Sequence, residues 1–269
     1  MHRWPVEVRI PKANHGARHL FRAWPDIIAR LKNNESRALL LDFDGTLVRL
    51  RRRPEEARLS ERGKRILKRL VTSKRLFVAV VSGRKRKTLE TMVGVEGIRY
   101  IGLHGAERGA EPVILSKTAG RDLVRAQQGI RSGVHALPGI WIEEKKLSFA
   151  VHYRGAHRAS LTEADRVIRQ IVAPMRNTLR VLNGNKVWEV MPQEIPGKGA
   201  AVRQLLEDLP ASTIAMYFGD DQTDEEAFAN LPGQITVKVG GNRNTRARYY
   251  LRSPSEVVRC LLRLERELT

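Results

Sequence analysis

The sequence predicts an α/β fold, in which a doubly wound parallel sheet forms the core and a small α+β domain is inserted into it. Short apolar runs alternate with amphipathic segments through the first hundred residues and again after about residue 197, which is the order of a parallel sheet covered by helices. Between these regions the apolar residues change to a period of two, which is typical of antiparallel strands. With 269 residues, 42% of them hydrophobic, the chain can bury such a core.

The expected domain boundaries follow from where this alternation starts, stops and resumes. Residues 1–35 form a basic leader containing three prolines and one short helix at about 24–31. The core is expected over 36–109 and 193–269, and the inserted α+β domain over 110–192. The single cysteine excludes a disulfide framework, and no apolar run reaches the ~18–20 residues of a membrane span. The N-terminus lacks a secretory signal, so a cytoplasmic protein is expected.

Each core strand is expected where several apolar residues run together without interruption. In chain order these runs are 38–41, 76–81, 98–103, 213–218 and 235–239. Amphipathic helices are expected between them, the first with Ser60 as its N-cap. These helices cover about 60–73, 85–93, 198–208, 224–231 and 255–267.

The inserted domain is expected to combine two helices with antiparallel strands. A helix at about 118–136 precedes a strand at 147–153, in which apolar and polar residues alternate. A capping-box-like start at Thr162 predicts the second helix. A β-hairpin is expected next, with Asn183-Gly184 as its turn.

The chain is strongly basic, with 49 Lys+Arg against 29 Asp+Glu and a formal net charge of +20. Basic clusters at 49–53, 62–69 and 84–87 could neutralise nucleic-acid phosphates. Aromatic residues are only 6% and do not interleave with these clusters, which argues against base stacking. We therefore interpret the clusters as solvated faces whose field attracts anionic substrates, and keep nucleic-acid binding as a remote alternative.

Two carboxylates, Asp42 and Asp44, directly follow the first buried strand. Ligands of an open parallel sheet collect beyond the carboxyl ends of its strands. One carboxylate there could act as a nucleophile, while the other could protonate a leaving oxygen and then activate water. Gly45 would let the chain turn away sharply.

Ser82 and Lys198 are expected at the same edge of the sheet. Ser82 ends the second buried strand beside Gly83, where its hydroxyl could donate to a phosphate oxygen or cap a helix. Lys198 lies between two glycines at a helix start, where it could hold a phosphate and screen a carboxylate. Solvated lysines near turns are also common, so Lys198 alone indicates little.

An acidic segment, Gly219–Glu225, follows the strand at 213–218. Crowded carboxylates repel one another unless a cation compensates, and hard oxygen ligands select Mg²⁺. The dipole of the following helix explains Asp224 and Glu225, but it does not explain the adjacent pair Asp220-Asp221. The segment therefore predicts a Mg²⁺ site.

In chain order, the segments DFDGTL, SGR, the isolated Lys198 and GDDQTDE resemble the four motifs of haloacid dehalogenase-superfamily phosphatases. Over about residues 36–269 the chain is also similar to the trehalose-6-phosphate phosphatase family, on the segments GLHGAE, IEEKKLS, VHYR and VWEVMP. The inserted domain resembles that family's α+β cap. The resemblance implies Mg²⁺-dependent hydrolysis of trehalose 6-phosphate to trehalose and phosphate, with sucrose 6-phosphate or a glycosyl-glycerate phosphate as alternative substrates.

The resemblance also implies a role for each motif residue. Asp42 would form an aspartyl-phosphate, and Asp44 would give a proton to the departing sugar hydroxyl and then activate water. Ser82 and Lys198 would hold the phosphoryl oxygens. The metal would be held by Asp42, Asp220 and the backbone carbonyl of Asp44, with Asp221 and Asp224 as candidates to bind the ion or support its ligands.

The partner implied by the resemblance is a small sugar phosphate. No membrane partner is expected, and nucleic-acid binding stays the remote alternative. A monomer is expected, with a functional link to a trehalose-phosphate synthase. The residues expected to contact the substrate are Arg84 and His104 in the core and Glu143, Lys145, Arg154 and Glu189 in the cap.

Overall fold

The structure is a computed structural model that describes residues 16–51, 53–109, 114–145, 147–184, 186–241 and 244–269. The chain divides into two compact units. The core unit contains the chain up to Arg108, residues 197–220 and residues 224–269, and the cap unit contains residues 109–196 with 221–223. Within the described residues, no helix is long and apolar enough to cross a membrane.

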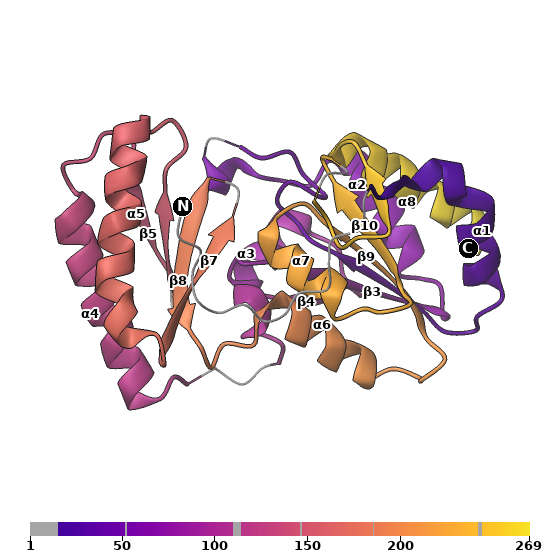
Figure 1. Ribbon diagram of the computed structural model, residues 1–269. Helices are drawn as coiled ribbons and strands as arrows, with labels where there is room; N and C mark the ends of the chain where they lie inside the picture. The colour runs from indigo at the N-terminus through magenta and orange to yellow at the C-terminus, as the bar shows by residue number, and fades with distance from the viewer. Residues whose placement is uncertain (1–15, 52, 110–113, 146, 185, 242–243) are drawn as a thin grey trace. The chain divides into compact units, whose positions relative to one another are not determined.

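The core unit is built on a parallel sheet of seven strands, which confirms the predicted fold class (Figure 1). Neighbouring strands pair in parallel throughout. Across the sheet the order is β1 (Arg18–His19), β11 (Tyr249–Leu251), β10 (Ile235–Val239), β9 (Ile214–Gly219), β2 (Arg37–Leu41), β3 (Leu76–Val81) and β4 (Arg99–Ile101).

Helices cover both faces of this sheet, because successive side chains of a strand point to opposite faces. Leu39 and Leu41 of β2 pack in one hydrophobic cluster, and Ala38 and Leu40 pack in another. The first cluster includes side chains of α1 (Trp24–Lys32), α2 (Glu61–Leu70), α3 (Arg86–Val93) and α8 (Pro254–Leu268). The second includes side chains of α6 (Gly197–Glu207) and α7 (Gln222–Ala229).

Two local predictions for the core unit can be compared directly with the structure. Ser60 is the N-cap of α2, and its hydroxyl accepts a hydrogen bond from the Gly63 N–H at 3.1 Å. Cys260 lies in the core as a free thiol, and burial raises the pKa of that thiol.

The segment expected as a separate leader differs from that expectation in its described part. β1 pairs with β11 and so extends the edge of the sheet. Trp24, Ile27 and Leu31 of α1 are buried in the core. Neither the two residues of β1 nor the three residues of β11 lie within a longer apolar run, and so these strands were not predicted. Residues 1–15 of the expected leader lie outside the described part of the chain.

The cap unit contains an antiparallel sheet in the order β5 (Trp141–Glu144), β6 (Phe149–His152), β8 (Val187–Pro192) and β7 (Leu179–Gly184). Helices α4 (Lys117–Val134) and α5 (Arg158–Val172) pack against each other, and α4 also contacts β8 (Figure 1). In register, Glu143 lies opposite Ala150, and Ala150 lies opposite Glu189. Both glutamates therefore lie on one face of the sheet.

Three details of the cap unit differ from the predictions. Helix α5 begins at Arg158, and Thr162 lies inside it, where its hydroxyl donates to the Arg158 carbonyl oxygen. Asn183 and Gly184 do not form the hairpin turn but end β7, where they pair with Trp188 and Val187. β5 was not predicted, because its glutamates hide the apolar alternation of a strand.

Candidate active site

The polar residues of the core unit lie at the carboxyl ends of three neighbouring strands. Asp42 follows β2, Ser82 follows β3 and Asp220 follows β9. These strands are adjacent and parallel in the order β9-β2-β3. Because their carboxyl ends meet at one edge, the side chains that follow them come together there.

Lys198 is the buried cation of this site. Its ammonium group donates to Asp42 Oδ1 at 2.8 Å and to Asp224 Oδ1 at 2.9 Å. The Lys198 side chain is only 3% exposed, and those of Asp42 and Asp224 are 4% and 0% exposed. Lys198 is therefore not a solvated lysine beside a turn, because it joins two segments that are far apart in the sequence.

Tyr217 of β9 contacts the same carboxylate from within the core. Its hydroxyl donates to Asp224 Oδ1 at 2.7 Å. Burial, together with the negative charge of Asp224, raises the pKa of Tyr217 well above its ordinary value. Tyr217 thus stays protonated and acts as a donor that fixes Asp224. The sequence did not mark it as a site residue, since a tyrosine in an apolar strand is typical of a core position.

Asp42, Asp220 and Asp224 form an acidic cluster, in which one oxygen of each carboxylate lies within 4.8 Å of the others. Such crowding favours a bound divalent cation, because three carboxylates in one place repel one another. Oxygen ligands of this kind suit a hard ion. The donor set thus fits a divalent metal ion, with Lys198 compensating part of the charge.

The acidic cluster depends on a close approach of backbone to side chain at Gly45. Gly45 has φ +83°, and a Cβ placed there would lie 2.1 Å from Asp220 Oδ2. Any larger residue would displace the Asp220 carboxylate. The Lys238 ammonium group donates to the Asp220 carbonyl oxygen and so holds the backbone directly after β9.

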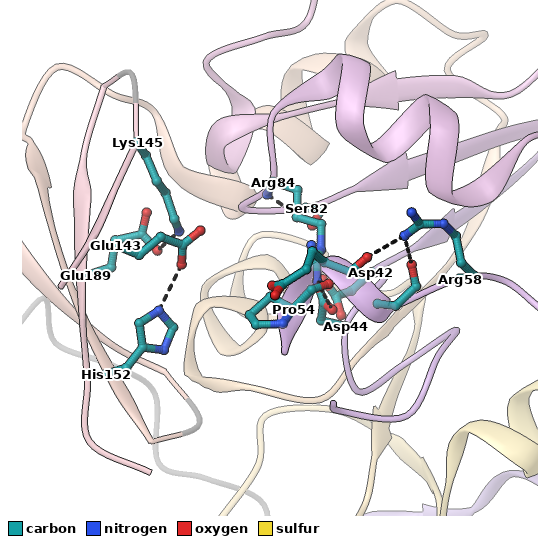
Figure 2. A network of polar contacts seen from close by, with 12 residues as sticks. Asp42, Asp44, Pro54, Arg58, Ser82, Arg84, Glu143, Lys145, His152 and Glu189 are labelled. Carbon is teal, nitrogen blue, oxygen red and sulfur yellow. Dashed lines mark hydrogen bonds and ion pairs between the residues drawn. The ribbon is translucent and has the colours of Figure 1, made fainter. Parts of the chain in front are cut away.

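Asp44 is held by Arg84 in a bidentate ion pair (Figure 2). Arg84 Nε donates to Asp44 Oδ2 at 2.6 Å, and Arg84 Nη2 donates to Asp44 Oδ1 at 2.7 Å. The same Nη2 also donates to the carbonyl oxygen of Pro54 at 2.8 Å. Arg84 was predicted as a substrate contact, and in this structure its guanidinium group positions the carboxylate of Asp44.

Ser82 and His104 belong to two loops that support each other. Ser82 Oγ accepts the Arg84 N–H at 3.3 Å, while the N-cap of α3 is Lys85 and not Ser82. His104 is buried with φ +54°, and its backbone N–H donates to the Ser82 carbonyl oxygen at 3.0 Å. A Cβ at Gly83 would lie 2.5 Å from His104 Nε2. His104 thus packs against the Ser82 loop, in a left-handed backbone conformation that is common at functional sites.

Asp221 was predicted as a further metal candidate, and its carboxylate is used locally. Its Oδ1 accepts the N–H of Thr223 at 2.9 Å and the hydroxyl of Thr223 at 2.6 Å. These bonds stabilise the first turn of α7. The acidic cluster at the sheet edge is formed without Asp221, and it includes Asp224 directly.

Polar side chains gather on the cap sheet around Glu189 (Figure 2). Lys145 Nζ donates to Glu189 Oε2 at 2.9 Å. The Ser148 hydroxyl donates to Glu189 Oε1 at 2.7 Å. Glu189 is 7% exposed. Arg154, which was predicted with this group, is exposed two residues beyond the end of β6. The sequence did not mark Ser148, because a lone serine directly before a strand has no distinguishing signal.

Glu143 is fixed on the same sheet by His152. His152 Nε2 lies 2.8 Å from Glu143 Oε2, and this hydrogen bond is the main cause that lowers the pKa of Glu143. The His152 ring is stacked on Trp141, with the ring centroids 3.8 Å apart. Trp141 is 45% exposed. An exposed indole beside a carboxylate offers both an apolar plane and hydrogen-bond acceptors to a polar ligand.

Curated relatives with similar sequences are trehalose-phosphate phosphatases. The protein of that name from Mycobacterium tuberculosis is 34% identical over 245 residues, which are 86% of this chain and 62% of the relative. That from Mycobacterium leprae is 32% identical over 253 residues, which are 86% of this chain and 58% of the relative. This chain thus spans about three fifths of the length of these relatives.

Solved structures share the fold. The C-terminal domain of Candida albicans trehalose-6-phosphate phosphatase aligns with a TM-score of 0.79 at 24% identity, covering 94% of this chain and 99% of that chain. Aspergillus fumigatus trehalose-6-phosphate phosphatase aligns with a TM-score of 0.66 at 25% identity, covering 93% and 99%. A family model described as Trehalose-phosphatase matches residues 40–255. That match includes the site residues from Asp42 to Asp224 and the whole cap sheet. The chain therefore belongs to the Trehalose-phosphatase family.

Proposed function

We propose that this chain is a Mg²⁺-dependent phosphomonoesterase that converts trehalose 6-phosphate to trehalose and phosphate. The observation that carries the proposal is the pairing of buried Lys198 with Asp42, beside the acidic cluster at the carboxyl edge of the sheet. A carboxylate nucleophile with a cation and a metal site beside it suits phosphoryl transfer, which depends on positioning and on neutralising charge.

Asp42 is the proposed nucleophile. Its carboxylate attacks phosphorus, the bond from phosphorus to the sugar oxygen breaks, and an aspartyl-phosphate forms. Asp44 gives a proton to the departing oxygen and then takes one from the attacking water. Water attack on phosphorus releases inorganic phosphate and restores the Asp42 carboxylate. In this structure Arg84 bonds to both Asp44 oxygens, so the oxygen that carries the transferred proton has to leave its guanidinium bond before Asp44 acts as the acid.

Ser82 and Lys198 are proposed to hold the phosphoryl oxygens. The Ser82 hydroxyl accepts a backbone N–H, which leaves its own proton for donation to a phosphate oxygen. The bonds to Asp42 and Asp224 hold the Lys198 ammonium group beside the proposed nucleophile, where its positive charge would attract the phosphoryl oxygens.

The metal is proposed to be Mg²⁺, held by Asp42, Asp220 and the backbone carbonyl of Asp44, with Asp224 completing the acidic group. When bound, a divalent ion supplies positive charge that stabilises the developing charge on the phosphoryl oxygens. Lys198 and Tyr217 keep Asp224 in a single orientation, and Gly45 leaves the room that Asp220 requires.

The sugar is proposed to bind on the polar face of the cap sheet. Glu189 and Glu143 are fixed by Lys145, Ser148 and His152, and such ordered acceptors can discriminate among sugar hydroxyls. Arg154 and His104 remain proposed substrate contacts. The cytoplasmic location, the monomeric state and the functional link to a trehalose-phosphate synthase also remain proposals.

A substrate panel tests this proposal. Phosphate release is measured from trehalose 6-phosphate, sucrose 6-phosphate and glucosylglycerate phosphate, each with Mg²⁺ and after chelation. We expect the largest kcat/KM for trehalose 6-phosphate and no turnover after chelation. Equal kcat/KM values for the three substrates would contradict the proposed specificity, whereas absence of turnover with all three would contradict the proposed activity.

A further inference from the structure

An open cavity of about 370 Å³ lies between α2 and α8 of the core unit. None of the residues that line it belongs to the candidate active site. The lining residues are Arg62, Arg65, Ile66, Arg69, Leu262 and Glu265.

The cavity presents three guanidinium groups from one face of α2. Arg62, Arg65 and Arg69 are spaced at i, i+3 and i+7, which places them along a single side of the helix. All three are exposed. Like charges at this spacing destabilise a helix, so an anion bound among them would relieve their repulsion.

One of the three arginines is anchored, and the other two are open to a ligand. Arg69 Nη1 donates to Glu265 Oε1 at 2.6 Å, and the Glu265 side chain is only 9% exposed. The side chains of Arg62 and Arg65 make no hydrogen bond or ion pair with any residue in the described part of the chain, and Arg65 acts on Glu61 only through its charge. The buried carboxylate therefore fixes one guanidinium group at the cavity, while two remain available.

The base of the cavity is apolar. Ile66 is buried in the core, and Leu262 is partly buried against the same core. A small ligand could thus place an apolar part on Ile66 and Leu262 while its anionic part reaches the arginines. The volume is in the lower range of small-molecule sites.

We propose that this cavity binds a small anion that carries a di- or triphosphate group. Planar guanidinium groups match phosphate oxygens with paired N–H donors, and three of them against one carboxylate leave an excess of positive charge for a multiply charged anion. The phosphate chemistry could come from an inorganic polyphosphate or from a nucleoside polyphosphate. This site goes beyond the proposed phosphatase function and does not depend on it.

The test is isothermal titration calorimetry of the whole chain in metal-free buffer at physiological ionic strength. Inorganic triphosphate and ATP are titrated separately into the wild type, into R62Q/R65Q and into the control R121Q/R125Q. The control removes two exposed charges from α4, which lies in the cap unit. Glutamine is a good helix former, so both double variants should fold, which thermal unfolding without ligand would check.

We expect saturable binding to the wild type and to R121Q/R125Q with the same Kd. R62Q/R65Q should bind at least about tenfold more weakly, because two charge-assisted hydrogen bonds are lost. Tighter binding of ATP than of triphosphate would identify a nucleoside polyphosphate as the source, while equal binding would identify the inorganic anion. Equal weakening in both double variants, an unchanged Kd in R62Q/R65Q, or no binding of either probe would overturn the proposal.

Discussion

Replacing Lys198 by methionine tests the electrostatic arrangement of the site. The substitution keeps most of the side-chain volume but removes the ammonium group that lies 2.8 Å from Asp42 and 2.9 Å from Asp224. All three side chains are at most 4% exposed. Removing one partner of a buried pair costs about 3–5 kcal/mol, because the remaining charge is left buried without compensation. We therefore expect K198M to lose about 3–5 kcal/mol of unfolding free energy.

The assay is urea denaturation at pH 8, followed by circular dichroism. The wild type, K198M and the control K68M are compared in metal-free buffer and with Mg²⁺. Lys68 is exposed on α2 and makes no ion pair with any described residue, so K68M should change the unfolding free energy by less than about 0.5 kcal/mol. Mg²⁺ should restore part of the unfolding free energy that K198M loses, because an ion that binds only the folded state stabilises that state.

A K198M protein that unfolds in metal-free buffer at the same urea concentration as the wild type would refute this reasoning. It would mean that the three carboxylates tolerate one another without a cation. A loss that Mg²⁺ does not reduce would contradict the assignment of the acidic cluster as a metal site, while leaving the Lys198 pairing intact.

Two further changes test the geometry of each unit. Gly45→Ala places a Cβ where the Asp220 carboxylate lies, so the rate of phosphate release should fall about a hundredfold. The control Gly233→Ala has a similar φ of +80° but open space around the new Cβ, and it should keep wild-type activity. Equal activity of the two variants would contradict the close approach of Gly45 to Asp220. His152→Ala removes the hydrogen bond that lowers the pKa of Glu143 from 4.5, so an NMR titration should show that carboxyl titrating at higher pH than in the wild type. In the wild type this bond stabilises the fold at pH values above the unfolded-state pKa of Glu143. That stabilisation is lost as the pH falls through the lowered folded-state pKa. An unchanged titration of Glu143 in His152→Ala would disprove the contact.

The core of the fold could be predicted because its strands are continuous apolar runs. β3 and β10 begin and end at the predicted residues, since a strand buried on both faces carries no polar interruption. β1 and β11 were not predicted because neither lies within a longer apolar run, unlike the equally short β4. Their pairing depends on contacts with distant parts of the chain, which a local pattern does not contain.

In the candidate site, the sequence named residues that the structure brings together, but it did not name their partners. Asp42 and Lys198 are 156 positions apart, and only the parallel sheet brings them together. The bidentate bond from Arg84 to Asp44 was not predicted, because an arginine that follows a serine and a glycine gives no indication of its direction. Asp221, which stays a predicted metal candidate, bonds to Thr223 through its carboxylate, and the acidic run of the sequence did not indicate this contact.

The most direct test of the central claim is phosphate release from trehalose 6-phosphate by the wild type and by Asp42→Asn, both with Mg²⁺. The substitution replaces one carboxylate oxygen by an amide nitrogen and keeps the size of the side chain, so the variant should fold, as circular dichroism would check. The wild type should turn over many equivalents of substrate, and the variant should release none. Wild-type rates from Asp42→Asn would show that Asp42 is not the nucleophile and would contradict the account.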